Sequence, residues 1–283
     1  MSTKVSLIIP SWNTREILKN NLVALFQIKS VVDFEVIVVD NGSHDGSAKM
    51  VREEFPQVHL IQNDWNSGFA HACNQGLRMA RGEVMILLNS DMVVKEGTLE
   101  KVFYTLTQRK EVGILGVKLL KEDGSVLSSV RRDPGFVDQL AILLKLPRLF
   151  PKIIDQYLYK DFDYQKSAEV EQVRGSFFAF RREMLEKVGW LDEKNFFFWF
   201  EEVDYCRRVR QAGYKIWYEA DATCQDLVGQ SVRKMSLAKK QAMFSRGLTR
   251  FFFKWHPWWQ GAIFFCLRPL VIAVGFLIDL WPR

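Results

Sequence analysis

The sequence has little cysteine, and no two cysteines stand at a metal-binding or redox spacing. The 283 residues contain four cysteines and no CxxC motif. This pattern excludes a disulfide framework and a cysteine-ligated zinc site, and it is typical of reduced, mostly buried thiols in a cytosolic protein. The cysteines are Cys73, Cys206, Cys224 and Cys266.

Glycine-rich phosphate-binding motifs are also missing. The chain contains neither GxGxxG nor GxxxxGK[ST], which argues against a typical dinucleotide-binding fold and against a P-loop. It contains no internal repeat and no low-complexity tract. The first apolar run stops at Pro10 and is too short for a secretory signal, so we expect no signal peptide there.

Acidic residues are nearly absent from the C-terminal segment. Residues 227–283 contain nine Lys or Arg and one acid, Asp279, which leaves 30 basic and 32 acidic residues in the rest of the chain. A nucleic-acid-binding protein would more often carry its basic residues through the folded domain, so we expect no nucleic-acid partner. A basic segment rich in Phe and Trp favours an anionic membrane surface instead.

Short apolar runs alternate with segments of helical spacing through the first 117 residues. Buried strands that alternate with helices predict βαβ units and an α/β fold with a mostly parallel sheet. The predicted strands are Val5–Ile9, Val36–Val39, Val58–Ile61, Val84–Leu88 and Val112–Val117, and the predicted helices are 14–27, 45–54, 67–81 and 97–110. Further along we expect a hairpin turn at Asp123-Gly124, a strand at Val173–Phe180, and helices at 182–188 and 200–213.

The C-terminal segment, 232–283, is expected to form a separate membrane-associating unit. A basic helix is predicted at 236–254, and the mostly apolar stretch Ala262–Trp281 approaches the roughly 20 residues that span a bilayer. Arg268 and Pro269 near its middle favour interfacial or re-entrant burial, since a charge there costs at least roughly 2.5 kcal/mol. A true span and packing against the rest of the protein are the alternatives.

Polar residues stand where the predicted strands end. Ligands of open parallel sheets lie beyond the carboxyl ends of strands, so these residues are candidates for a binding site. Asp40 is expected to contact a ligand, because Asn41 and the residues after it already supply the turn. Asn66 to Gly68 opens a helix and either offers N–H groups to a phosphate or simply caps that helix. Asp91 either holds Mg²⁺ or Mn²⁺ together with a diphosphate or belongs to an ordinary turn.

Two adjacent carboxylates, Glu201 and Glu202, follow an aromatic run at 196–200. Apolar surroundings raise the pKa of a carboxyl group and suit it to general-base chemistry. The neighbouring Asp204 has a simpler explanation, because it stands at helical spacing from Arg207 and Arg208.

Several segments occur in the order and spacing of a known family. They are VSLIIPSWN, VIVVDNGSHDGS, NSGFAHACNQGL, ARGEVMILLNSDM, RGSFFAFRREMLEKVGWLDE and FFFWFEEVDYCRRVRQAGYKI. Over about residues 3–231 the chain resembles family 2 glycosyltransferases, above all the rhamnosyltransferase-like branch that builds bacterial surface polysaccharides. The resemblance implies a GT-A catalytic domain over 1–231, a nucleotide-diphosphate sugar donor, a divalent metal and inversion at the anomeric carbon.

The resemblance also implies roles for individual residues. The expected nucleotide-binding residues are Pro10, Trp12, Asp40, Asn66, Gly68 and Ser90, with Pro10 and Trp12 bordering the nucleobase and Asp40 hydrogen-bonded to it. Asp91 is the expected metal ligand of the NSD motif. The expected sugar and acceptor pocket contains Arg174, Gly175 and Trp199.

The chain departs from the family pattern in two places. Glu202 stands where the family usually has Asp as the catalytic base, which leaves the base open between Glu202 and Glu201. The family often has a metal-binding His near the end of this region, whereas the chain offers Asp226, with Gln225 as a weaker candidate.

The implied activity is a single displacement that extends a lipid-linked glycan at the cytoplasmic face of the bacterial inner membrane. The branch favours dTDP-rhamnose as the donor. Transfer to a polyprenyl phosphate and a catalytically inactive nucleotide-sugar-binding protein are the alternatives, and a homodimer is left open.

Overall fold

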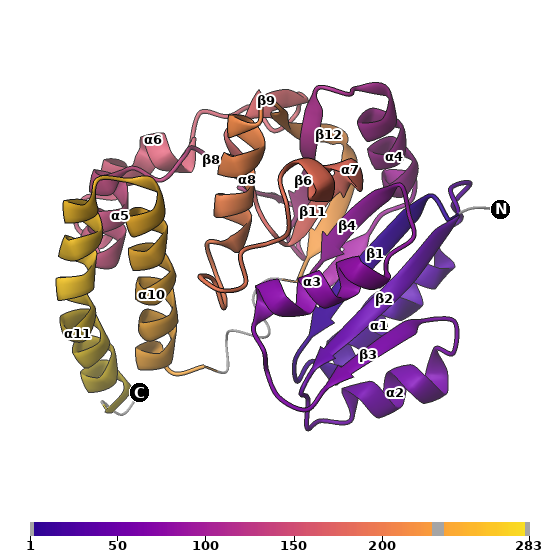
Figure 1. Ribbon diagram of the computed structural model, residues 1–283, viewed down its shortest axis with the longest axis horizontal. Coiled ribbons are helices and arrows are strands. Elements are labelled where there is room, and N and C mark those ends of the chain that lie inside the picture. The colour runs from indigo at the N-terminus through magenta and orange to yellow at the C-terminus, as the bar shows by residue number, and fades with distance from the viewer. Residues whose placement is uncertain (1–2, 228–234, 281–283) are drawn as a thin grey trace.

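A ten-stranded mixed sheet forms the centre of the computed structural model, which describes residues 3–227 and 235–280 (Figure 1). The strand order is β3-β2-β1-β4-β11-β6-β12-β5, with β7 paired to β6 and β9 paired to β12. The pairs β1–β2, β1–β4, β2–β3 and β6–β12 are parallel, whereas β11 is antiparallel to both of its neighbours. The predicted α/β class with a mostly parallel sheet is confirmed.

The strands and helices have the following bounds. The strands are β1 (Val5–Ser11), β2 (Phe34–Asn41), β3 (His59–Asn63), β4 (Val84–Leu88), β5 (Met92–Val94), β6 (Val112–Leu120), β7 (Val126–Leu127), β8 (Val130–Arg131), β9 (Ala168–Val170), β10 (Gln172–Val173), β11 (Phe177–Arg181) and β12 (Lys215–Asp226). The α-helices are α1 (Arg15–Gln27), α2 (Ser47–Glu54), α3 (Phe69–Met79), α4 (Thr98–Gln108), α5 (Phe136–Leu143), α6 (Asp155–Leu158), α7 (Glu183–Lys187), α8 (Glu201–Gln211), α10 (Leu237–Trp255) and α11 (Trp258–Leu280). Two short 3₁₀ helices are η1 (Leu146–Arg148) and η2 (Pro151–Ile154).

Helices cover both faces of the sheet. One apolar core joins one face to α1, α2 and α4, and a second core joins the other face to α3, α7 and α8. All seven residues of β1 and all five of β4 are buried, as expected for strands covered on both sides. This three-layer arrangement places the carboxyl ends of β1 and β4 beside each other at one edge of the sheet.

The structure corrects two details of the predicted elements. The strand expected at Val173–Phe180 is divided into β10 and β11, because Arg174 to Ser176 leave the ladder. The long strand β12 was not predicted. It pairs with β6, β9 and β5, and its register shifts between Glu219 and Thr223. The hairpin turn at Asp123-Gly124 is present between β6 and β7.

The C-terminal helices α10 and α11 lie side by side at one end of the molecule (Figure 1). They share a third apolar core with Phe196, Phe200 and Val203 of the main body. The ends of the pair are tied together, because the Asp279 carboxylate accepts hydrogen bonds of 2.9 Å from the N–H groups of Leu237 and Ala238. Among the described residues, α11 is the one helix whose length and composition would allow it to cross a membrane.

Candidate active site

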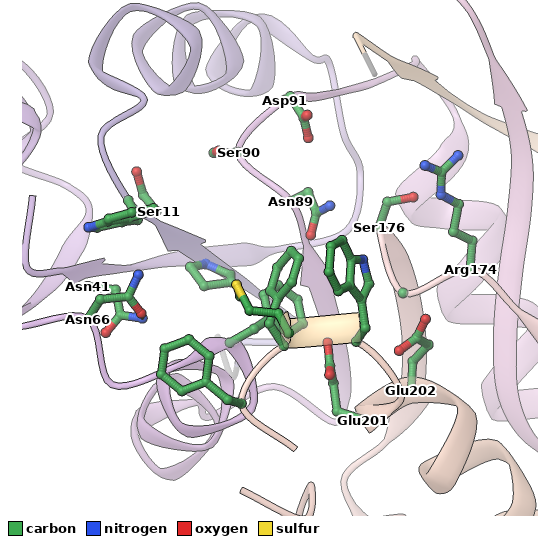
Figure 2. A pocket seen from close by; sticks show the side chains of 18 of the residues that line it. Ser11, Asn41, Asn66, Asn89, Ser90, Asp91, Arg174, Ser176, Glu201 and Glu202 are labelled. Carbon is green, nitrogen blue, oxygen red and sulfur yellow. The ribbon is translucent and has the colours of Figure 1, made fainter. Parts of the chain in front are cut away.

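A pocket opens at the sheet edge where β1 and β4 end. Its lining residues come from the ends of several strands, from the loops that follow them and from α8 and α10. They are Pro10, Ser11, Trp12, Asn41, Asn66, Phe69, Asn89, Ser90, Asp91, Arg174, Gly175, Ser176, Phe197, Phe198, Trp199, Glu201, Glu202, Asp226, Met235 and Met243. Figure 2 shows Glu201 and Glu202 on one side of this pocket and Asn89 and Asp91 on the other.

The NSD motif is a short, buried connection between β4 and β5. The Asn89 N–H donates to the Ser176 carbonyl at 3.0 Å, and the Asn21 amide donates to the carbonyls of Asn89 and Ser90. Ser90 also accepts a hydrogen bond from the Thr14 hydroxyl at 3.2 Å. These bonds fix the motif to α1 and to the start of β11, so Asp91 enters the pocket from a rigid support.

Asp226 lies next to Asp91 at this rim. The strand β12 pairs antiparallel with β5, with Asp226 opposite Met92, and the Leu227 N–H donates to the Asp91 carbonyl at 3.0 Å. Arg174 places its Nη1 3.6 Å from Asp226 Oδ2. Gln225 does not line the pocket, since its side chain accepts from Lys95 instead.

The pair of carboxylates fits a divalent cation shared with a donor. Mg²⁺ is commonly held by one or two carboxylates, with substrate phosphate oxygens and water completing its shell. The described residues contain no cluster of three or more His, Cys, Asp or Glu that would hold an ion alone. Asp91 and Asp226 are therefore the residues that would hold Mg²⁺ or Mn²⁺, with ligands also supplied by a diphosphate.

Glu201 and Glu202 begin α8 on the opposite side of the pocket. Burial and the nearby charge of Glu202 raise the pKa of Glu201 well above its usual value. Burial also raises the pKa of Glu202, while the positive charge of Arg174 opposes that shift. Oε2 of each carboxyl group is buried and has no hydrogen-bond partner among the described residues. Two close carboxyl groups in such surroundings do not ionise together, and Arg174 favours the charge on Glu202.

The backbone leading into α8 is strained. Trp199 and Phe200 have φ angles of 67° and 73°, which large side chains adopt only at a cost of about 1–3 kcal/mol each. Gly247 of α10 lies against this turn, where a Cβ would stand 3.0 Å from the Phe200 ring and 3.1 Å from the Trp199 carbonyl. The helix α10 thus supports the turn that presents Glu201 and Glu202.

Three N–H groups at the start of α3 are hydrogen-bonded within the protein. The N–H groups of Ser67 and Gly68 donate to side-chain oxygens of Asn41 and Asn66, and the Phe69 N–H donates to the Phe197 carbonyl at 2.7 Å. Gly68 has a φ of 95° and packs against Phe197, where a Cβ would come within 2.7 Å. Gly68 does not line the pocket, and these bonds fix the turn that precedes α3, while phosphate binding at this helix start stays a prediction.

Asp40 lies behind the pocket wall. Its side chain is 1% exposed, and Oδ2 accepts a hydrogen bond of 3.2 Å from the Ser43 N–H. Oδ1 is buried and has no hydrogen-bond partner among the described residues. The neighbouring Asp45 has a structural role, since it accepts hydrogen bonds from the N–H groups of Arg15 and Ser47.

Most of the predicted residues meet in this pocket, and the structure adds some that sequence reasoning missed. Pro10, Trp12, Asn66, Ser90, Arg174, Gly175 and Trp199 line it with the four carboxylates, while Asp40 and Gly68 do not. Asn89 and Ser176 stand beside predicted residues, so adjacency could have indicated them. Met235 and Met243 carry no signal in the sequence, because the return of the C-terminal segment to the pocket is a tertiary event. Lys239 of the same segment lies 5.6 Å from the Trp12 ring.

A family model for glycosyl transferase family 2 matches residues 6–189, which include β1 apart from Val5, the NSD motif and the Arg174 segment. The chain belongs to glycosyl transferase family 2. This chain is 26% identical over 200 residues to an N-acetylglucosaminyl-diphospho-decaprenol L-rhamnosyltransferase of Mycobacterium tuberculosis. The match covers 66% of this chain and 64% of that protein. The chain is 24% identical over 221 residues to the low-salt glycan biosynthesis hexosyltransferase Agl10 of Haloferax volcanii, covering 76% and 64%.

A shorter match agrees with this membership, and a solved structure shows the fold. An uncharacterized glycosyltransferase of Bacillus subtilis, YfnE, is 41% identical over 101 residues. The match covers 35% of this chain and 26% of that protein. The chain thus spans less than two thirds of the length of these curated relatives. The mannosyltransferase PcManGT of Pyrobaculum calidifontis, solved with GDP-Man and Mn²⁺, superposes with a TM-score of 0.61 at 21% identity, covering 98% of this chain and 74% of that one. The GT-A fold is therefore confirmed.

Proposed function

We propose that this protein is an inverting, metal-dependent glycosyltransferase. It moves a sugar from a nucleotide-diphosphate donor to a hydroxyl group of a lipid-linked glycan. The observation that carries the proposal is the placement of the carboxylates in one pocket. Asp91 and Asp226 lie beside each other in the lining of the pocket, and the pair Glu201 and Glu202 lies on the side opposite Asp91 (Figure 2).

The donor site would extend along the ends of β1 and β2. Pro10, Trp12 and Asn66 line that part of the pocket and would border the nucleobase. Asp40 could reach the base only after a small rearrangement of the wall, and its unpaired Oδ1 supports that role because buried polar atoms normally have a partner. A Mg²⁺ or Mn²⁺ ion on Asp91 and Asp226 would neutralise charge on the departing diphosphate.

Glu202 would act as the general base. Its carboxylate accepts the proton of the acceptor hydroxyl while that oxygen attacks the anomeric carbon from the face opposite the diphosphate. Arg174 keeps Glu202 ionised more readily than Glu201, whose pKa is raised by burial and by the Glu202 charge. Glu201 would stay protonated and prevent a second negative charge from accumulating beside the base. Gly175 leaves room for this arrangement, since its missing Cβ would lie 3.2 Å from Glu202 Cβ.

A lipid-linked acceptor is supported by the name of the mycobacterial relative, which acts on a decaprenol diphosphate, and by the apolar helix α11. These features also support a place at the cytoplasmic face of the bacterial membrane. The rhamnosyltransferase name favours dTDP-rhamnose among the donors. The alternative acceptor is a polyprenyl phosphate, and the alternative function is nucleotide-sugar binding without transfer.

Release of nucleoside diphosphate from a panel of dTDP-, UDP- and GDP-sugars, with and without Mn²⁺, tests the proposal. Acceptors would be a polyprenyl-diphosphate-linked sugar and a polyprenyl phosphate. We expect metal-dependent release with one donor and only with the diphosphate-linked acceptor, and loss of release in Asp91→Asn. Donor binding without transfer to either acceptor would favour the inactive binding protein.

A further inference from the structure

The helix α11 is apolar around most of its circumference. One stripe, formed by Gly261, Phe264, Val271 and Gly275, is buried against the protein. Most of the remaining side chains are exposed, although the apolar stretch of the helix has a mean hydropathy of 2.3 and only 22% of that stretch is buried. We call its exposed large side chains the outer face of α11: Trp258, Trp259, Ile263, Phe265, Leu270, Val274, Phe276, Leu277, Ile278 and Leu280. A helix of this kind is stable in lipid rather than in water.

A second exposed apolar group lies in the 144–153 segment, which follows α5. Leu149 and Phe150 are 74% and 61% exposed, and Leu144 and Ile153 are exposed as well. The segment joins the C-terminal helices through α5, where the Phe136 ring lies 5.2 Å from that of Trp259. Its exposed charged residues are all basic, namely Lys145, Arg148 and Lys152. Apolar side chains interleaved with Lys and Arg are the signature of a surface that binds an anionic bilayer.

We propose that the outer face of α11 and the 144–153 segment together form a docking surface for an anionic lipid bilayer, with α11 lying in the membrane plane. The proposal rests on the membrane location proposed above, but not on the sugar-transfer chemistry. It assigns the protein one membrane face made from two parts of the chain, and it excludes a transmembrane orientation of α11.

The partner helix α10 excludes the transmembrane orientation. It packs along α11, and Asp279 ties the far end of α11 to the start of α10. A spanning α11 would therefore carry α10 to the same depth, together with its basic residues. These are Lys239, Lys240, Arg246, Arg250 and Lys254. Each Lys or Arg at the bilayer centre costs roughly 2.5–3.5 kcal/mol, whereas an in-plane hairpin keeps α10 on the water side.

The other side of α10 is already occupied by the main body. Lys254 lies 2.7 Å from the buried Asp204 carboxylate, and the Trp255 indole N–H donates to the same side chain at 2.8 Å. Gly247 packs on the turn before Glu201. Inserting α10 into lipid would draw this turn and the pocket out of water, so only α11 is available for immersion.

A second copy of the chain is the competing occupant of this surface. The exposed charged residues that the 144–153 segment adds to the surface, Lys145, Arg148 and Lys152, are all basic, so two such surfaces facing each other would repel. An anionic bilayer has the opposite charge and accepts the whole apolar outer face. Charge complementarity therefore favours lipid over a dimer.

Depth measurements on α11 test the in-plane orientation. Cys266 is exposed, and the other three cysteines are buried, so a fluorophore can be attached there selectively. The second site is Leu277→Cys in a Cys266→Ser background, which is on the same face eleven residues further along. With nitroxide lipids as quenchers, we expect the two depths to agree within about 5 Å. A spanning helix centred on Pro269, with a rise of 1.5 Å per residue, would place the two sites about 4.5 Å and about 12 Å from the bilayer centre, and such depths would overturn the proposal.

Vesicle flotation tests the 144–153 segment. The full chain is mixed with phosphatidylcholine vesicles, with or without 30% phosphatidylglycerol. We expect the triple variant Lys145→Gln, Arg148→Gln and Lys152→Gln to bind the anionic vesicles about 100-fold more weakly, because each cation near such a surface contributes about 1 kcal/mol. A matched control removes the exposed Lys29, Lys49 and Arg52 from the other end of the molecule and should bind as the wild type does.

Three results would overturn the docking surface. The first is an equal loss of vesicle binding in the triple variant and in its control. The second is a triple variant that binds anionic vesicles as tightly as the wild type does. The third is a wild-type chain that does not bind anionic vesicles but sediments as a dimer. Glu202→Gln separates this inference from the proposed function. That variant should float with vesicles as the wild type does while failing to transfer sugar, so either proposal can fail without the other.

Discussion

Replacing Glu202 is the most direct test of the proposed chemistry. Glu202→Gln keeps the size of the side chain and its packing against Gly175, but it removes the group that accepts a proton. Because a positioned general base contributes about 10² to 10⁴-fold, we expect kcat to fall by that factor. The KM for the donor should change little, since the donor would bind on the opposite side of the pocket.

Two further substitutions separate the roles of the paired carboxyl groups. Glu202→Asp keeps the charge but withdraws it by one methylene, and a displacement of about 1 Å can cost about 10²-fold. Glu201→Gln replaces a carboxyl group that we expect to be protonated, so kcat should fall less than about tenfold. The burial that raises the pKa of Glu202 also predicts that kcat/KM rises with pH through a value above that of an ordinary Glu.

The assay is acceptor-dependent release of nucleoside diphosphate across pH 5 to 8, with thermal unfolding as a control for folding. Equal losses in Glu201→Gln and Glu202→Gln would refute the division of roles. A Glu202→Gln protein with more than a tenth of the wild-type kcat would remove Glu202 as the base. If Glu201→Gln alone were inactive, the base would be Glu201.

Two other substitutions and a second measurement on Glu201→Gln follow from the structure of the pocket. Asp226→Asn should raise the Mn²⁺ concentration for half-maximal activity at least about tenfold, as measured by metal titration. If that concentration did not change, Asp91 would be the sole protein ligand of the ion. Gly175→Ala should lower kcat about tenfold with an unchanged melting temperature, because the new Cβ would lie 3.2 Å from Glu202 and displace it slightly. Burial raises the pKa of folded Glu201, so its carboxyl group favours the folded state below the ordinary Glu pKa and loses that advantage as pH rises through the raised value. Glu201→Gln should therefore increase the free energy of unfolding by about 1 kcal/mol at pH 8 and by less at pH 5, as measured by denaturant titration. An equal increase at both pH values would contradict this explanation.

Local sequence predicted the central strands because burial on both faces leaves a continuous apolar run. The run Val84–Leu88 matches β4 at both ends, β1 extends its predicted run to Ser11, β2 extends its run at both ends, and β6 extends its run to Leu120. The strand β12 escaped prediction for the opposite reason. Every second residue from Ile216 to Asp226 is buried, but several of these buried side chains are small or polar, such as Ala220, Ala222 and Asp226. The alternation is therefore weak in the sequence, and a register shift interrupts the strand.

Site residues that follow an apolar strand or segment could be predicted from the sequence. The closeness of residues from distant strands could not, because it depends on how those strands pair. Asp91 and Glu202 could be singled out because carboxylates interrupt or follow apolar segments. The closeness of Asp226 to Asp91 depends on the pairing of β12 with β5, which no local pattern reveals. The resemblance to the family supplied Asp226 as a candidate, and the sheet explains why it lies at the same rim.

The C-terminal helices connect membrane docking to the pocket. Leu248 and Phe251 of α10 share an apolar core with Phe196 and Phe200, and Met243 lines the pocket itself. Removing residues 232–283 would therefore strip the turn before Glu201 of its support and leave Asp204 without two of its partners. Loss of membrane binding after such a deletion could then reflect damage to the fold, whereas substitutions on the outer face of α11 alter only its contact with lipid. A bilayer that holds α11 in place would, through α10, also steady the strained turn that presents the base, so anionic vesicles should raise kcat as well as the local acceptor concentration.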